Sequence, residues 1–235
     1  MALVLISFDL DGTLIDTAAE LAEAVNRTLA DFDLPAQPAA HITGLIGRGA
    51  HALMRAVLDG LGAEGRPAEA AVLARFDTHC AQVCGSLSQP YAGARQALLR
   101  LRQHAVRLAC VTNKERVHAR RLLQSHDLLH HFELVIGGDS LPQQKPHASV
   151  LQHVAGTLGV ARGAMAHVGD SAIDIAAARQ AGVRAWAVPH GYNAGRPIAE
   201  EHPDLLLPDL AAVAQAALDA ASLPPSHIPC PTRFA

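Results

Sequence analysis

The sequence has 235 residues, of which 50% are hydrophobic, 17% charged and 3% aromatic, and its formal net charge is −3. This length predicts one or two domains, and the hydrophobic content excludes a disordered or fibrous chain. The charge excludes a basic surface for nucleic acid or anionic membranes, and so few aromatic residues exclude a base-stacking platform. No apolar run reaches the ~18 residues of a membrane-spanning helix and the opening residues do not resemble a signal peptide, so we expect a cytoplasmic protein.

The first predicted element is a strand over residues 3–8, because a short continuous apolar run is typical of a parallel strand buried on both faces. The pattern becomes helical after Asp16. Thr17 and Glu20 form a candidate capping box at the start of this helix, and the proline-containing segment 34–38 ends it.

Further helices follow, and a regular alternation of strands and helices begins beyond residue 90. The helices are expected over about 51–61 and 67–84, with no strand between 16 and about 89. Alternating strands and helices argue for a parallel sheet flanked by helices. The strands of this part are expected over 107–112, 133–136, 164–168 and 184–188.

The expected fold class is therefore α/β, with a Rossmann-like parallel sheet core, helices on both faces and an inserted all-helical cap domain. The core is expected to comprise residues 1–15 and 90–221, and the cap residues 16–89. The proline-rich tail, 222–235, is expected to be mobile.

Polar residues follow four of the predicted strands where each strand ends. Ligands of parallel α/β sheets collect at this edge. Single carboxylates are also common in turns and helix caps, and Asp16 and Asp139 are interpreted in that way. The remaining residues form the candidate site: Asp9 and Asp11 after the first strand, Thr112 and Asn113 after the second, Lys145 after the third, and Asp170 and Asp174 after the fourth.

The same residues stand in four ordered motifs: Asp9-Leu-Asp-Gly-Thr-Leu, Thr112-Asn113, Lys145-Pro146 and Gly169-Asp170-Ser-Ala-Ile-Asp174. Together they resemble the motifs of the haloacid dehalogenase-like hydrolase superfamily, over the whole chain except the tail. The resemblance implies phosphoryl transfer with Mg²⁺ as cofactor. It also implies that Asp9 is the nucleophile and a metal ligand. Asp11 would protonate the leaving oxygen, activate the water that follows, and bind the metal through its main-chain carbonyl.

The resemblance assigns the other candidates as well. Asp170 is implied as the second carboxylate ligand, with Asp174 orienting Asp170 or a metal-bound water. Thr112 and the backbone amide of Asn113 are implied to hold the phosphoryl oxygens. Lys145, one of only two lysines in the chain, would supply a compact positive charge beside them.

Within this superfamily the sequence favours a phosphatase. Dehalogenation needs no second acid at the position of Asp11, and phosphonate hydrolysis needs a cap lysine, which residues 16–89 lack. The glycine-rich segment 44–50 is a candidate anion site for a substrate carboxylate, with Gly47 and Arg48 as specificity residues. Segment 190–198 resembles a loop of phosphoglycolate phosphatases, which implies hydrolysis of 2-phosphoglycolate to glycolate.

Three alternatives stay open. A sugar phosphomutase of the β-phosphoglucomutase type shares the core and cap, and Arg48 or Arg55 would bind its second phosphate. The others are a phosphatase for another sugar phosphate or a nucleotide, and a phosphate sensor without catalysis. Each predicts a small phosphorylated metabolite as partner, with neither nucleic acid nor membrane, and none predicts an oligomeric state. His167 and His190 are interpreted as packing or surface histidines.

Overall fold

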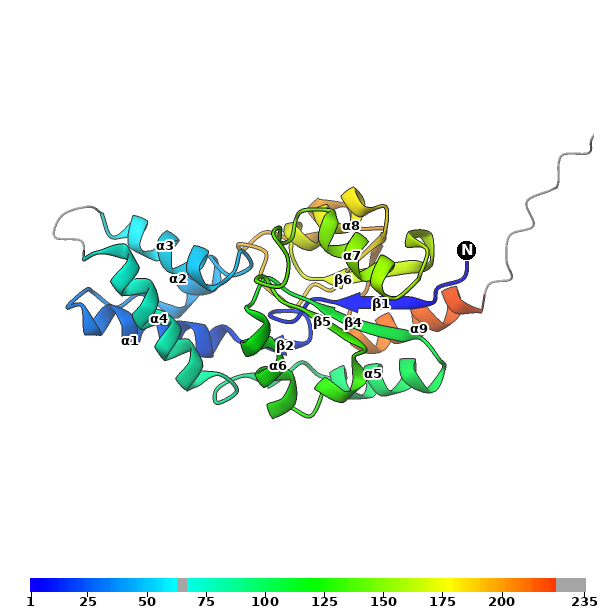
Figure 1. Cartoon of the computed structure of the whole chain (residues 1–235), viewed down its shortest axis with the longest axis horizontal. Coiled ribbons are helices and arrows are strands. Elements are labelled where there is room, and N and C mark those ends of the chain that lie inside the picture. The colour runs from blue at the N-terminus through cyan, green and yellow to red at the C-terminus, as the bar shows by residue number, and fades with distance from the viewer. Residues whose placement is uncertain (63–66, 223–235) are drawn as a thin grey trace, which may run out of the picture.

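The structure is a computed structural model that describes residues 1–62 and 67–222. Within these residues a six-stranded sheet has the order β5-β4-β1-β6-β7-β8, with all neighbouring pairs parallel (Figure 1). The strand predictions are confirmed to within two residues at each end. The sequence did not predict β8, an edge strand that is too short to show a periodic pattern. The strands are β1 (Leu5–Phe8), β4 (Arg107–Val111), β5 (Leu134–Ile136), β6 (Met165–Gly169), β7 (Arg184–Ala187) and β8 (Leu205–Leu206).

Helices cover both faces of this sheet, as expected. Buried side chains of α5, α6 and α9 form one hydrophobic core with the sheet, and those of α7 and α8 form another on the opposite face (Figure 1). The helices are α5 (Ala94–Gln103), α6 (Arg116–Ser125), α7 (Ser149–Thr157), α8 (Ala172–Ala181) and α9 (Leu210–Ala221). Short 3₁₀ helices lie at Leu129–His131, Arg162–Ala164 and Ile198–Glu201.

Residues between the first strand and residue 89 form a helical unit at one end of the molecule (Figure 1). Its helices pack around a hydrophobic core of their own, separate from the two cores of the sheet. The division of the chain into a core and a cap domain stays a prediction. The helices are α1 (Ala18–Asp31), α2 (Ala39–Thr43), α3 (Ala50–Gly60) and α4 (Glu69–Val83), of which the short α2 was not predicted.

The two connections between this helical unit and the sheet lie side by side. They pair as a short antiparallel ribbon of β2 (Ile15–Asp16) and β3 (Gln89–Pro90). The sequence pattern predicts no strand between 16 and about 89, and this ribbon lies at the two limits of that range. A strand of two residues has no periodicity, so only the pairing of distant segments reveals it.

The predicted capping box of α1 is wrong. Thr17 stands at the N-cap but makes no side-chain cap; its Oγ1 donates to Asp11 Oδ1 at 2.7 Å. The buried carboxylate of Glu20 instead accepts hydrogen bonds from the backbone N–H groups of Gly85, at 2.9 Å, and Ser88, at 3.1 Å. Both residues therefore stabilise the junction between the helical unit and the sheet, a use that the local pattern cannot reveal.

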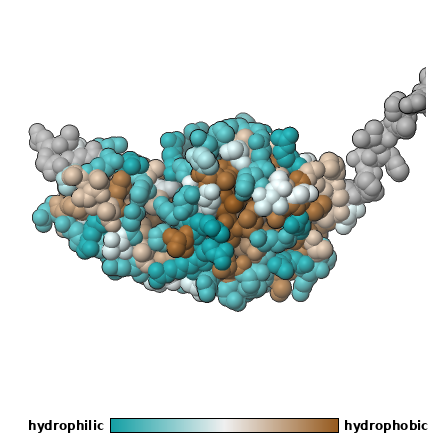
Figure 2. Space-filling model, viewed as in Figure 1, coloured by the Kyte–Doolittle hydropathy of each residue, from teal (hydrophilic) through white to brown (hydrophobic). Residues whose placement is uncertain are grey.

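In the view of Figure 2 the outer surfaces are mostly hydrophilic, and hydrophobic residues gather over the sheet between its helical layers. Across the described residues, the structure contains no helix with the length and apolar character needed to cross a membrane. The predicted mobile tail, apart from Ser222, lies outside the described residues.

Candidate active site

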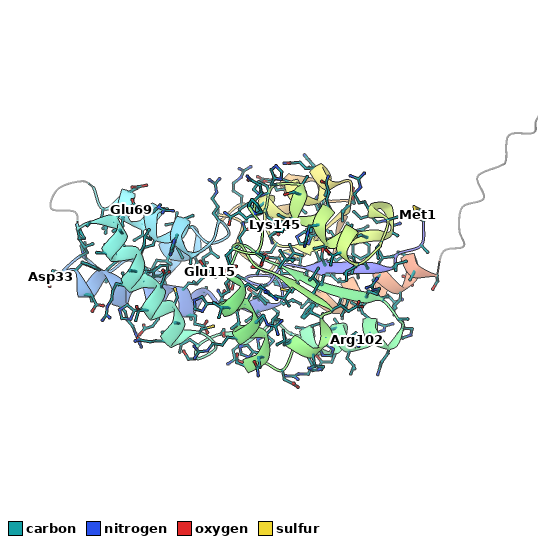
Figure 3. All side chains as sticks on the ribbon, in the orientation of Figure 1. Met1, Asp33, Glu69, Arg102, Glu115 and Lys145 are labelled. Carbon is teal, nitrogen blue, oxygen red and sulfur yellow. The ribbon has the colours of Figure 1, made fainter. Side chains whose placement is uncertain are left out.

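The carboxyl ends of the central strands bring the candidate residues together at one edge of the sheet. Strand β1 pairs in register with β4 on one side and β6 on the other, so Asp9, Thr112 and Asp170 follow neighbouring strands. Lys145 comes from the loop after β5 and lies at the edge of the sheet that faces the helical unit (Figure 3). The structure thus brings these residues to one edge of the sheet, and their roles stay a prediction.

Three carboxylates form the centre of this site. One oxygen from each of Asp9, Asp170 and Asp174 lies within 4.8 Å of the others, the one such acidic group within the described residues. Burial raises the pKa of Asp9 to about 7, with Lys145 opposing the shift and Asp174 adding to it. Burial and the two neighbouring carboxylates also raise the pKa of Asp170 well above its usual range. A second positive charge beside Lys145 would relieve this repulsion.

Lys145 lies between two of these acids. Its Nζ is 2.7 Å from Asp9 Oδ1 and 2.7 Å from Asp174 Oδ1, and its side chain is 2% exposed. Burial alone would lower the pKa of Lys145, but the adjacent Asp174 and Asp9 raise it overall. The contact with Asp174 is a hydrogen bond, whereas Asp9 Oδ1 has no hydrogen-bond donor of suitable angle among the described residues. That buried oxygen, paired with Lys145 by charge, can take a cation as a further partner.

Asp170 is fixed by contacts from two loops, the one after β1 and the one after β7. Its Oδ1 accepts a hydrogen bond from Thr13 Oγ1 at 2.7 Å, and its Oδ2 accepts one from the backbone N–H of Tyr192 at 2.5 Å. Two glycines give the carboxylate room, since a Cβ would lie 2.4 Å from Oδ2 if added at Gly12 and 2.1 Å if added at Gly191. Gly12 also has a φ of +86°, which other residues rarely adopt.

Asp174 is held beneath the site by α8 and β6. It forms a capping box with Ser171 at the start of α8, in which Asp174 Oδ2 accepts from Ser171 Oγ at 2.6 Å. Its other oxygen contacts Lys145 and lies 3.2 Å from His167 Nε2. Burial would raise the pKa of Asp174, but Lys145 and His167 outweigh it and lower the pKa. Both oxygens have partners, which suits a residue that orients its neighbours rather than one that binds an ion directly.

Asp11 has a different set of partners, at the junction with the helical unit. Besides Thr17, its carboxylate faces the ammonium of Lys114, whose Nζ lies 3.0 Å from Oδ1 and 3.1 Å from Oδ2. The sequence motifs did not assign Lys114 to the site. Its position directly after Thr112 and Asn113, in a chain with only two lysines, was the available signal.

Asn113 connects the site to the glycine-rich segment of the helical unit. Its Nδ2 donates to the carbonyl oxygens of Gly47, at 3.1 Å, and of Lys145, at 3.0 Å. The neighbouring carbonyl of Arg48 accepts from Gln144 Nε2 at 3.3 Å. Gly47 and Arg48 thus lie against the loops that carry the candidate residues, and their role in specificity stays a prediction.

Two further residues of the site were not assigned from the sequence. Besides its bond to Asp170, Tyr192 uses its hydroxyl to accept from the backbone N–H groups of Thr17, at 2.8 Å, and Ala18, at 3.0 Å. His167 was interpreted as a packing or surface histidine. It is buried, but it also contacts Asp174. Segment 190–198, which contains Tyr192, was singled out as a loop, but nothing in the sequence indicates the contact of His167.

The donor set fits a hard divalent cation. Carboxylate oxygens are the ligands that such ions prefer, and Asp9 supplies a buried oxygen without a hydrogen-bond donor. Lys145 balances only part of the charge of the three acids. The arrangement is a buried acidic centre that suits a divalent cation, with the ammonium of Lys145 beside it as a partner for an anionic ligand.

Comparison with known proteins gives a consistent result. The model of the haloacid dehalogenase-like hydrolase family matches residues 6–188. The chain is 42% identical over 184 residues to the plasmid phosphoglycolate phosphatase of Cupriavidus necator, covering 78% of this chain and 80% of that protein. It is 39% identical over 214 residues to phosphoglycolate phosphatase 1 of Pseudomonas aeruginosa, covering 88% and 76%. The crystal structure of a predicted phosphoglycolate phosphatase from Haemophilus somnus superposes with a TM-score of 0.88 at 32% identity, covering 91% of this chain and 97% of that one.

Proposed function

This chain belongs to the haloacid dehalogenase-like hydrolase family, and on that premise we propose that it is a Mg²⁺-dependent phosphatase that converts 2-phosphoglycolate to glycolate and phosphate. The observation that carries the proposal is the meeting of Asp9, Asp170 and Lys145 at the carboxyl edge of the sheet. The relatives named phosphoglycolate phosphatase support the choice of substrate.

Asp9, Asp170 and the main-chain carbonyl of Asp11 would hold the Mg²⁺. When bound, the ion neutralises carboxylate charge and polarises the phosphoryl oxygens of the substrate. Asp174 would orient Lys145 and not bind the ion itself, because its oxygens are engaged by Lys145, His167 and Ser171.

Asp9 is the nucleophile of the proposed reaction. A bond forms between its carboxylate oxygen and phosphorus while the bond from phosphorus to the glycolate oxygen breaks, leaving an aspartyl-phosphate. Asp11 protonates the departing oxygen, then takes a proton from the water that hydrolyses the aspartyl-phosphate. The hydroxyl of Thr112, the backbone N–H of Asn113 and the Lys145 ammonium hold the phosphoryl oxygens.

A phosphomutase is less well supported, since it must bind a second phosphate of a bisphosphate. The arginines considered for that task, Arg48 and Arg55, line a cleft that Asn113 and Gln144 also line. Arg55 is also paired with Glu69 at 2.8 Å. The cavity directly over Asp11 contains no arginine among its described lining residues.

The test is phosphate release from a panel of monoesters, with Mg²⁺ and with EDTA. We expect 2-phosphoglycolate to be among the best substrates by kcat/KM, and EDTA to abolish turnover. A poor rank for 2-phosphoglycolate would remove the substrate assignment and leave the phosphatase. Formation of glucose 6-phosphate from β-glucose 1-phosphate and a bisphosphate activator would identify a mutase, and no turnover of any monoester would favour a sensor.

A further inference from the structure

Lys114 is the one positively charged side chain lining the cavity over Asp11, within the described part of the chain. The other described lining residues are Asp11 itself and residues of the helical unit: Leu21, Ile46, Gly47, Gly49, Ala50 and Leu53. The lysine side chain is 10% exposed and the aspartate side chain 14%. This cavity therefore places one ammonium among mostly apolar walls, where its charge is poorly screened by water.

The Lys114 ammonium has a single partner among the side chains that the structure describes. Both of its hydrogen bonds go to the Asp11 carboxylate, at 3.0 and 3.1 Å. Lys145, by contrast, is already shared between Asp9 and Asp174. Lys114 is thus the lysine whose partner can be exchanged without disturbing the acidic centre.

The proposed function requires Asp11 to reach the oxygen that leaves phosphorus. In the structure both oxygens of Asp11 are engaged, by Lys114 and by Thr17. In 2-phosphoglycolate a single methylene group separates the leaving oxygen from a carboxylate. A substrate with its leaving oxygen beside Asp11 would have its carboxylate one methylene group away, and Lys114 Nζ lies 3.0 Å from Asp11 Oδ1.

We propose that Lys114 is the specificity-determining residue that binds the substrate carboxylate, exchanging the Asp11 carboxylate for that of the ligand. This inference rests on the proposed function and names the group that would recognise its substrate. The exchange leaves Lys114 paired with a carboxylate throughout, which avoids a buried unpaired ammonium. It also frees Asp11 from one of its two partners as the substrate enters. Monoesters without a carboxylate lack the group that would make this exchange.

The test compares 2-phosphoglycolate with 2-hydroxyethyl phosphate, in which an uncharged hydroxymethyl group replaces the carboxylate. The wild-type enzyme should prefer 2-phosphoglycolate by about 100-fold or more in kcat/KM, because a site built around a charged partner rejects a ligand that lacks it. In Lys114→Met this preference should fall to within about 3-fold. Arg121→Met removes a positive charge from the same junction, where Arg121 contacts the carbonyl of Ala81, and should keep the preference.

Lys114→Met leaves the Asp11 carboxylate buried without its ammonium, which could unfold the protein. A second pair of variants therefore tests the proposal without this unpaired charge. Asp11→Asn and the double variant Asp11→Asn, Lys114→Met contain no such unpaired carboxylate. Calorimetric titration with Mg²⁺ present should show 2-phosphoglycolate binding about 100-fold more weakly to the double variant than to Asp11→Asn. The affinity for 2-hydroxyethyl phosphate should change less than about 3-fold.

Two results would overturn the inference. If the Lys114 variants keep the preference, the carboxylate is bound elsewhere, for example by the glycine-rich segment 44–50. If they lose activity and affinity equally for both ligands, Lys114 only supports Asp11. In either case the wild-type enzyme still hydrolyses 2-phosphoglycolate, whereas failure of the proposed function would appear as a wild-type enzyme that does not prefer it.

Discussion

The imidazole of His167 lies between Asp174 and Ser7, with Nε2 3.2 Å from Asp174 Oδ1 and Nδ1 2.8 Å from Ser7 Oγ. Because a carboxylate only accepts hydrogen bonds, Nε2 carries the proton and Nδ1 accepts from the serine hydroxyl. Burial lowers the pKa of His167, which favours this neutral form. The same Asp174 oxygen accepts from Lys145. His167 thus orients Asp174, which in turn orients Lys145.

Replacing His167 with Phe keeps an aromatic ring and removes both hydrogen bonds. We expect kcat to fall about 10-fold and the half-saturating Mg²⁺ concentration to rise about 10-fold. Effects of this size are typical of residues that orient a metal site through hydrogen bonds without binding the ion. Steady-state kinetics over a Mg²⁺ series measures both. His153→Phe, at an exposed position of α7, is the matched control and should behave like wild type. Unchanged kinetics in His167→Phe would mean that Lys145 and Ser171 position Asp174 without His167.

Asp9→Asn keeps the size of the side chain and removes the nucleophilic oxygen. We expect kcat to fall by at least about 10³-fold, with an unchanged circular dichroism spectrum. Asp139→Asn is the control, because Asp139 Oδ1 accepts from the backbone N–H of Arg116 at the start of α6. It should stay within about 3-fold of wild type. Residual activity within about tenfold of wild type in Asp9→Asn would argue against Asp9 as the nucleophile.

Gly191→Ala tests the space beside Asp170. The new Cβ would lie 2.1 Å from Asp170 Oδ2, so the carboxylate must move. We expect at least a 10-fold rise in the half-saturating Mg²⁺ concentration, measured by activity. Gly156→Ala in α7 meets no atom within 4 Å and should leave activity unchanged, while stabilising the helix by about 0.5–1 kcal/mol. Wild-type Mg²⁺ dependence in Gly191→Ala would show that Asp170 does not bind the ion from this position.

The parallel topology explains why the acids of the site were predictable. Asp9 and Asp170 each directly follow an apolar strand, and parallel strands end at a common edge, so sequence position alone brings them together. Lys114 and His167 were not predictable in this way, because their partners, Asp11 and Asp174, are chosen by packing between separate segments. The residues next to Lys114 and His167 in the sequence therefore do not indicate these pairs.

The error at α1 has the same cause. Thr17 and Glu20 match a capping box by spacing, but each has a partner outside the helix. Glu20 accepts charge-assisted hydrogen bonds from the N–H groups of Gly85 and Ser88, whereas a capping box would give its carboxylate one such bond. The capping-box pattern covers four neighbouring residues, whereas Glu20 bonds to backbone groups more than 60 residues away in the sequence.

This use of Glu20 predicts a large effect on stability. Glu20→Ala removes a buried carboxylate and leaves the backbone N–H groups of Gly85 and Ser88 without their acceptor. We expect the free energy of unfolding to fall by about 2–4 kcal/mol, measured by urea denaturation. Glu23→Ala on the same helix removes only an exposed ion pair with Arg27 and should cost less than about 1 kcal/mol. Equal effects of the two variants would contradict this account of the junction.

The raised pKa values of Asp9 and Asp170 predict that stability and Mg²⁺ binding depend on pH in opposite ways. The folded Asp9 carboxyl has a pKa of about 7, against 3.8 for an unperturbed one, and burial is the main cause. Between these values the folded state holds a proton that the unfolded state has lost. Without Mg²⁺, this contribution to stability is therefore present at low pH and is lost as the pH rises through about 7.

Binding of Mg²⁺ must displace that proton, so the ion should bind more weakly below pH 7, by about 10-fold per pH unit for each proton displaced. The stabilisation by Mg²⁺, measured as the rise in Tm over the EDTA-treated protein, should accordingly be larger at about pH 8 than at about pH 6. Asp9→Asn has no carboxyl to deprotonate at this position and should show a weaker pH dependence of the Mg²⁺ effect. A rise in Tm that is the same at both pH values in the wild-type protein would mean that the ion does not bind at Asp9.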